Sequence, residues 1–186
     1  MEFIPYIQTQ VQLTPQTVEE LSKHTKIERY SKGDIIRNIN SMSKKVLFFE
    51  SGYARSFYLK ESKDITSIFL TENSFSMAIE SIYYNQGSRY GIEALEDVTV
   101  CSIQHSELQR INDHSPQMEK FLHTQLIKFI KLVSDKYYDI QLQSAQERYA
   151  SMLKNYPDIL LHAPLGHIAS YLGITQETLS RIRSGK

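Results

Sequence analysis

Polar side chains recur at helical spacing in the segment from Gln176 to Arg183, which reads QETLSRIR. Arginine can donate two hydrogen bonds to guanine, glutamine can pair with adenine, and glutamate can accept from the amino group of cytosine. Hydroxyl groups and the free amide groups at a helix N-terminus can bind phosphates. The residues that we expect to contact DNA are Thr175, Gln176, Glu177, Thr178, Ser180, Arg181 and Arg183.

The surrounding residues predict a helix-turn-helix that presents this segment. We expect a first helix over about 165–172, a turn at 173–175 and a second helix over 176–183. Gly173 can adopt a left-handed backbone conformation at low cost, and Thr175 can cap the second helix. An ordinary helical hairpin has the same apolar spacing, so it is the outward polar face that favours DNA recognition.

A longer amphipathic helix is predicted over residues 114–140. Its apolar residues follow one another at intervals of four, three, four and seven, close to the 3.5-residue repeat of a helix packed on a partner helix, and Lys136 occupies the missing position. Packing on the helix's own domain is the alternative. We expect a homodimer. Its seam comprises Leu122, Leu126, Phe129, Val133 and Ile140.

Residues 32–103 predict a series of short β-strands. Aromatic and β-branched runs such as KVLFFE and VTVCSI are separated by turn-forming segments, with no long helix between them. Strands at this spacing favour an antiparallel roll or barrel.

The composition limits the kinds of site. The chain of 186 residues has 21 Lys and Arg against 21 Asp and Glu, a formal net charge of +0, so DNA affinity must come from local charge. Cys101, the one cysteine, cannot form an intrachain disulfide or hold an iron–sulfur cluster, and we expect it to be buried. The histidines show no metal-ligand spacing, so no metal is expected. With no signal peptide and no membrane span of ~20 apolar residues, we expect a cytoplasmic protein.

With its β-strand region, long helix and terminal HIASYLGITQETLSRIR, the chain resembles the Crp–Fnr superfamily of bacterial transcription regulators, which is related to the cyclic AMP receptor protein. The match covers nearly the whole chain and includes KGDII, ESGYARSFY and EALED. The resemblance implies an α+β fold: an antiparallel, jelly-roll-type β-roll like a cyclic-nucleotide-binding domain over 1–113, a dimerisation helix over 114–140, and a helix-turn-helix domain lacking a full wing over 141–186. The implied partners are double-stranded DNA and a second copy, with RNA polymerase as a further candidate.

The segment that would hold a cyclic nucleotide departs from the family pattern. Met77-Ala78 stands where the family has Gly-Glu, and Ser88-Arg89-Tyr90 falls where an Arg-Ser-Ala-like run would be. We therefore expect no cyclic AMP binding by the usual contacts and no resident cofactor, and leave an unidentified effector open. The residues that could line an effector pocket are Phe75, Met77, Ala78, Glu80, Ser88, Arg89 and Tyr90. The aromatic residues among them, together with Tyr83 and Tyr84, could instead form a sealed core.

The leading interpretation is a homodimeric, sequence-specific transcription regulator and not an enzyme. The first alternative is an enzyme or ligand-binding protein built on a cupin-like β-barrel with a helical tail, but no strand carries the histidine pair that such metal sites use. No catalytic residue is expected. A sensor that binds only protein partners is the third hypothesis, and it leaves Arg181 without a role.

Overall fold

The computed structural model describes residues 1–61 and 63–185, and over these ranges the centre of the molecule is a β-roll of two four-stranded sheets. One sheet has the order β1-β8-β3-β6 and the other β2-β7-β4-β5, with every pairing antiparallel. The strands are β1 (Thr25–Tyr30), β2 (Ile35–Arg37), β3 (Lys45–Ser51), β4 (Ala54–Lys60), β5 (Lys63–Leu70), β6 (Phe75–Met77), β7 (Gly91–Ala94) and β8 (Val98–Gln104). The predicted antiparallel roll is confirmed.

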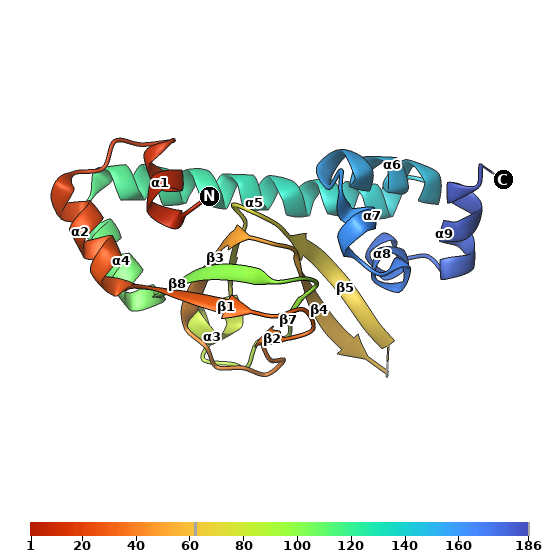
Figure 1. The fold of residues 1–186 in the computed structure, drawn as a ribbon, viewed down its shortest axis with the longest axis horizontal. Helices are drawn as coiled ribbons and strands as arrows, with labels where there is room; N and C mark the ends of the chain where they lie inside the picture. Colours follow the sequence, from red (N-terminus) through yellow and green to blue (C-terminus); the bar gives the residue numbers. More distant parts are fainter. Residues whose placement is uncertain (62, 186) are drawn as a thin grey trace.

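Most helices lie along one side and at both ends of the roll, whereas the short helix α3 lies on the side away from α5 (Figure 1). They are α1 (Phe3–Gln8), α2 (Pro15–His24), α3 (Ile79–Tyr83), α4 (His105–Asp113), α5 (Pro116–Leu142), α6 (Ala145–Asn155), α7 (Ile159–His162), α8 (Leu165–Leu172) and α9 (Gln176–Arg183). Helix α5 begins and ends two residues later than predicted. Its start is set by Ser115, which caps the helix by accepting a hydrogen bond from the backbone N–H of Met118. No helix in the described ranges has the length and apolar character needed to cross a membrane.

Strand β3 explains why KVLFFE is continuously hydrophobic. Val46 and Phe48 pack into a cluster with α1, α2, α4 and α5, whereas Leu47 and Phe49 pack inside the roll. A strand covered on both faces has no side that must be polar. The roll therefore has an interior core and an outer core, separated by β3 and its neighbours.

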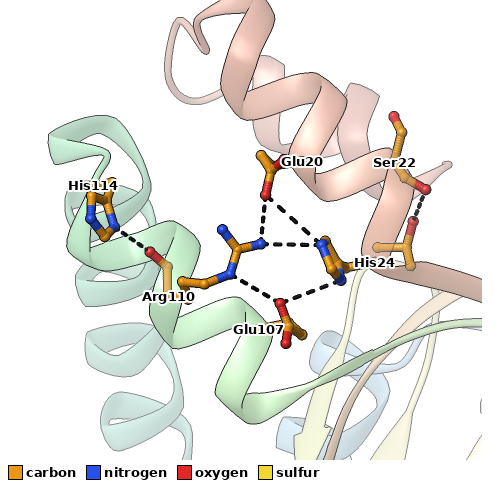
Figure 2. Close-up of polar contacts among 7 residues, drawn as sticks. Glu20, Ser22, His24, Glu107, Arg110 and His114 are labelled. Carbon is orange, nitrogen blue, oxygen red and sulfur yellow. Dashed lines mark hydrogen bonds and ion pairs between the residues drawn. The ribbon is translucent and has the colours of Figure 1, made fainter.

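A charged cluster joins α2 to α4 (Figure 2). Arg110 donates to Glu20 at 2.5 Å and to Glu107 at 3.1 Å, and His24 lies 3.3 Å from the Glu107 carboxylate. The Arg110 guanidinium holds the pKa of Glu20 below its ordinary value. Since these groups are partly exposed to solvent, which screens their attraction, they align the two helices more than they stabilise the fold.

Candidate nucleic-acid interface

Helices α8 and α9 form the predicted helix-turn-helix. Gly173 ends α8 in the left-handed conformation with φ at 68°, and the backbone N–H of Ile174 donates to the carbonyl of Ala169 at 3.0 Å. Thr175 caps α9 by accepting a hydrogen bond from the backbone N–H of Thr178 at 3.2 Å. The turn chemistry inferred from the sequence is therefore present in the structure.

A buried core holds the two helices against the rest of the C-terminal unit. Ile168, Ala169 and Leu172 of α8 and Leu179 of α9 are all at most 3% exposed. The same cluster contains Met152 of α6, along with Phe69 and Leu95 of the roll. The apolar side of α9 thus faces inward, which leaves its polar side free.

The outer face of α9 carries the residues that the sequence assigned to DNA. Of the seven, all are exposed except Thr178, which is half-buried. Within the described residues, the Arg181 side chain donates one hydrogen bond, to the Thr178 hydroxyl at 3.4 Å. A hydrogen bond from Thr175 holds the pKa of Glu177 below its ordinary value, so that its carboxylate can accept. Figure 1 places α9 at one end of the molecule, beyond α8 and away from the roll. The last residue of the predicted domain, 186, lies outside the described residues.

The first helix of this unit is fixed to the β4–β5 hairpin. The Ser170 hydroxyl donates to the carbonyl of Asp64 at 3.2 Å and accepts from the backbone N–H of Thr66 at 2.9 Å. Arg55, only 2% exposed, pairs with Asp64 at 2.5 Å and with Glu93 at 2.6 Å, and this holds the pKa of Asp64 below its ordinary value. The roll therefore sets the orientation of α8 without touching the outer face of α9.

Helix α5 has an exposed apolar face. Four of the predicted seam residues, Leu126, Phe129, Val133 and Ile140, are 43–56% exposed, while Leu122 packs against the outer core. The sequence analysis did not include the exposed residues Ile130 and Tyr137, which flank these positions. Lys136 contacts β5 and α8.

The seven predicted pocket residues do not converge on one space. Phe75 and Met77 pack on the outer core, whereas Ala78 and Glu80 lie at the start of α3. Ser88 is buried and bonds within its own loop, to the carbonyl of Tyr90 at 2.9 Å. Arg89 is 78% exposed and lies 3.9 Å from Glu80.

Two tyrosines at the end of α3 do not fit the sealed-core alternative for this segment. Tyr83 and Tyr84 are 60% and 69% exposed, so they are not part of a sealed core. Tyr90 is half-buried, with its ring 5.8 Å from that of Tyr58. Sequence reasoning missed two buried arginines, Arg37 and Arg55; Arg37 directly follows the predicted KGDII strand, and nothing in its position indicated burial. The described residues contain no group of three or more His, Cys, Asp or Glu side chains suited to a metal.

No family model matches the chain. Among curated proteins, it is 25% identical over 185 residues to the transcriptional activatory protein AadR of Rhodopseudomonas palustris, covering 91% of this chain and 74% of AadR. The structure is similar to FixK2 from Bradyrhizobium japonicum, with a TM-score of 0.74 and 21% identity over 87% of this chain and 83% of that one. It is also similar to a CooA mutant from Carboxydothermus hydrogenoformans, with a TM-score of 0.72 and 20% identity over 96% and 81%. A Crp/Fnr-family regulator from Eubacterium rectale gives a TM-score of 0.71 and 22% identity over 93% and 83%.

These similarities, together with the geometry above, define the fold. The chain has the fold of the Crp–Fnr transcription regulators: a β-roll, a long helix and a terminal helix-turn-helix. The resemblance and the fold class inferred from the sequence are confirmed.

Proposed function

We propose that the chain is a homodimeric, sequence-specific DNA-binding transcription regulator that reads a major groove with α9. The observation that carries the proposal is the exposed outer face of α9, where Gln176, Glu177 and Arg181 project from a helix whose inner side is anchored by Leu179. Side chains of these types discriminate between base pairs by hydrogen bonds. The proposal includes a cytoplasmic location, where a bacterial regulator would meet DNA, and RNA polymerase as a further partner.

The dimer rests on the apolar face of α5. A face that includes Leu126, Phe129 and Val133 at 43–49% exposure is a large apolar surface to leave in water, and a second copy of the same helix would cover it. Two copies would present two recognition helices to successive major grooves, ~34 Å apart. A dimer would also double the number of contacts with DNA, which matters because the chain has no net positive charge to attract it.

The effector, if the regulator uses one, is not cyclic AMP bound in the family's usual way. Arg89, the arginine nearest to the expected phosphate-binding position, is exposed and pairs with Glu80. Ser88 is already hydrogen-bonded within its loop. The alternative of a cupin-like enzyme is not favoured, since the structural relatives are regulators.

A selection on random duplex DNA tests the function. We expect the purified protein to enrich an inverted repeat whose half-sites lie about 10 bp apart, centre to centre. The selection is repeated at two salt concentrations, since phosphate contacts weaken with salt whereas the sequence preference stays. Failure to enrich any motif at both salt concentrations would contradict the proposal.

A further inference from the structure

A buried arginine in the β-roll has unused hydrogen-bond donors. Arg37, the last residue of β2, is 7% exposed. Within the described residues its Nε and Nη1 atoms have no hydrogen-bond partner, and Nη2 reaches only the Ser76 hydroxyl, at 3.4 Å. A guanidinium carries five N–H donors, so most of the donors of Arg37 are unsatisfied.

The second buried arginine of the roll shows what a satisfied guanidinium looks like in this protein. Arg55 is 2% exposed, and its nitrogens bond to Asp64, Glu93 and Thr66. Burying a charge without such partners is expensive, and proteins pair buried charges or bind a ligand with them. Arg55 thus has two carboxylate partners, whereas Arg37 has none among the described residues.

No carboxylate of the described residues fills this role. Glu80 is the acidic group that acts on Arg37, but through space: no ion pair or hydrogen bond joins the two side chains in the described ranges, and Glu80 lies 3.9 Å from exposed Arg89 instead. Burial lowers the pKa of Arg37 to about 10, which leaves the guanidinium charged at neutral pH. A permanent positive charge is thus kept inside the roll.

The position of Arg37 is suited to a small ligand. Strand β2 is the end strand of one sheet and β6 is the end strand of the other, so Arg37 and Ser76 face each other across the open edge of the roll. Phe75 and Met77 turn to the outer core, so Ser76, between them, faces inward with its pairing partner Leu47. Arg37 lies outside the 75–90 segment that corresponds to the family's nucleotide-binding cassette, whereas Ser76 lies within it.

We propose that Arg37 and Ser76 bind the oxyanion of a small molecule, a carboxylate or a phosphate, at the edge of the roll between β2 and β6. The planar guanidinium would hold two oxygens of the anion through Nη2 and either Nε or Nη1, the two forks by which Arg55 holds Glu93 and Asp64. The Ser76 hydroxyl would supply a neutral donor from the opposite sheet.

Thermal unfolding of the full chain tests the proposal without any use of DNA, so its result is independent of the proposed function. Wild-type protein is titrated at pH 7.5 with acetate, inorganic phosphate and cyclic AMP, each against chloride at equal ionic strength. Acetate probes a carboxylate, phosphate a phosphoryl group, and cyclic AMP a nucleotide. At least one anion should raise the melting temperature with saturation, whereas a general salt effect rises without saturating.

The variants assign the effect to Arg37. R37M should weaken the apparent affinity at least about tenfold, since bonds to charged groups are strong. R89M removes the exposed arginine of the neighbouring segment and should respond as wild type does. In chloride alone R37M should be at least as stable as wild type, because methionine removes an unpaired buried charge.

Two results would overturn the proposal: no saturable response to any of the three anions, or an equal response in R37M. If R37M does not fold, S76A takes its place. Loss of the serine hydroxyl should weaken the same saturable response about threefold or more. An unchanged midpoint in S76A would then argue against the site.

Discussion

The Nζ atom of Lys136 lies 3.7 Å from the centre of the Tyr171 ring, which links the long helix α5 to the first helix of the helix-turn-helix. The same ammonium group donates to the carbonyl oxygen of Ser67 in β5. One charged side chain thus joins α5, α8 and the roll, where a cation over an aromatic face is attracted by the ring.

Replacing Lys136 should change how stability depends on pH. Burial lowers the pKa of Lys136 from 10.5 to about 8, against the attraction of Asp139. The folded protein therefore binds fewer protons than the unfolded chain between these values, so the free energy of unfolding should rise with pH there, by up to about 1.4 kcal/mol per unit. Denaturant titrations from pH 7.5 to 10 should show this slope in wild type and lose it in Lys136→Met. Lys128→Met, at an exposed position on α5, should keep it, and equal slopes in both variants would contradict the assignment.

Replacing Arg181 should relax base preference at one position. The side chain is exposed on α9 and reaches only Thr178. A bidentate arginine–guanine contact contributes about 1–3 kcal/mol of discrimination, so Arg181→Ala should lose the preference at a single base pair in each half-site. The comparison is Arg29→Ala, which removes the same charge from the exposed side of β1. The check is the affinity for duplexes that carry each of the four bases in turn at each position. An unchanged base preference in Arg181→Ala would show that Arg181 does not contact a base.

The dimer should depend on the apolar face of α5. Introducing Leu126→Glu together with Val133→Glu would bury charges in the seam, and we expect about a 100-fold or greater loss of dimer affinity. Sedimentation equilibrium at micromolar concentration should show a dimer for wild type and a monomer for the double variant. Leu161→Glu alters a residue that is 83% exposed on α7 and should remain dimeric. A monomeric wild type would contradict the seam.

Cys101 should resist thiol reagents in the folded protein. Its side chain is 4% exposed in the outer core, and burial raises the pKa of the thiol from 9.0 to about 12. The thiolate, which is the reactive form, is therefore nearly absent at pH 8. A disulfide reagent should label Cys101 only after guanidinium chloride unfolds the chain. Rapid labelling of native protein would show that the outer core opens at this strand.

Gly52 should be less replaceable than Gly173, although both have positive φ, 87° and 68°. A methyl group at Gly52 would overlap the carbonyl oxygen of Asp97, whereas one at Gly173 meets nothing within 4 Å. Gly173→Ala should therefore cost only the backbone strain of about 1–2 kcal/mol. Gly52→Ala should cost clearly more, measured by denaturant unfolding, and equal losses would show that the turn after β3 can shift.

The sequence predicted the parts of the molecule whose pattern is local. The strands, α5 and the helix-turn-helix have periodicities and capping residues that are visible over a few turns, such as Thr175 and Gly173. The exposed face of α9 could be inferred because its apolar residues all fall on the other side.

The burial of Arg37 and the role of Lys136 depend on contacts between distant segments. Arg37 follows two isoleucines and would be exposed on an isolated strand, but β6 brings Ser76 opposite it. Lys136 fits a 3.5-residue repeat, yet at 3.6 residues per turn it lies about 80° from Leu126 around the helix. Its side chain reaches Ser67 in β5 and Tyr171 in α8, contacts between distant segments that the helical pattern does not show.

The hydrogen bonds between Ser170 and the backbone of β5 fix the helix-turn-helix rigidly to the β4–β5 hairpin. A shift of the hairpin would therefore move α8 and, with it, α9. Substitutions far from DNA, at Arg55 or Asp64, should consequently alter the operator spacing that the protein tolerates while leaving its base preference unchanged.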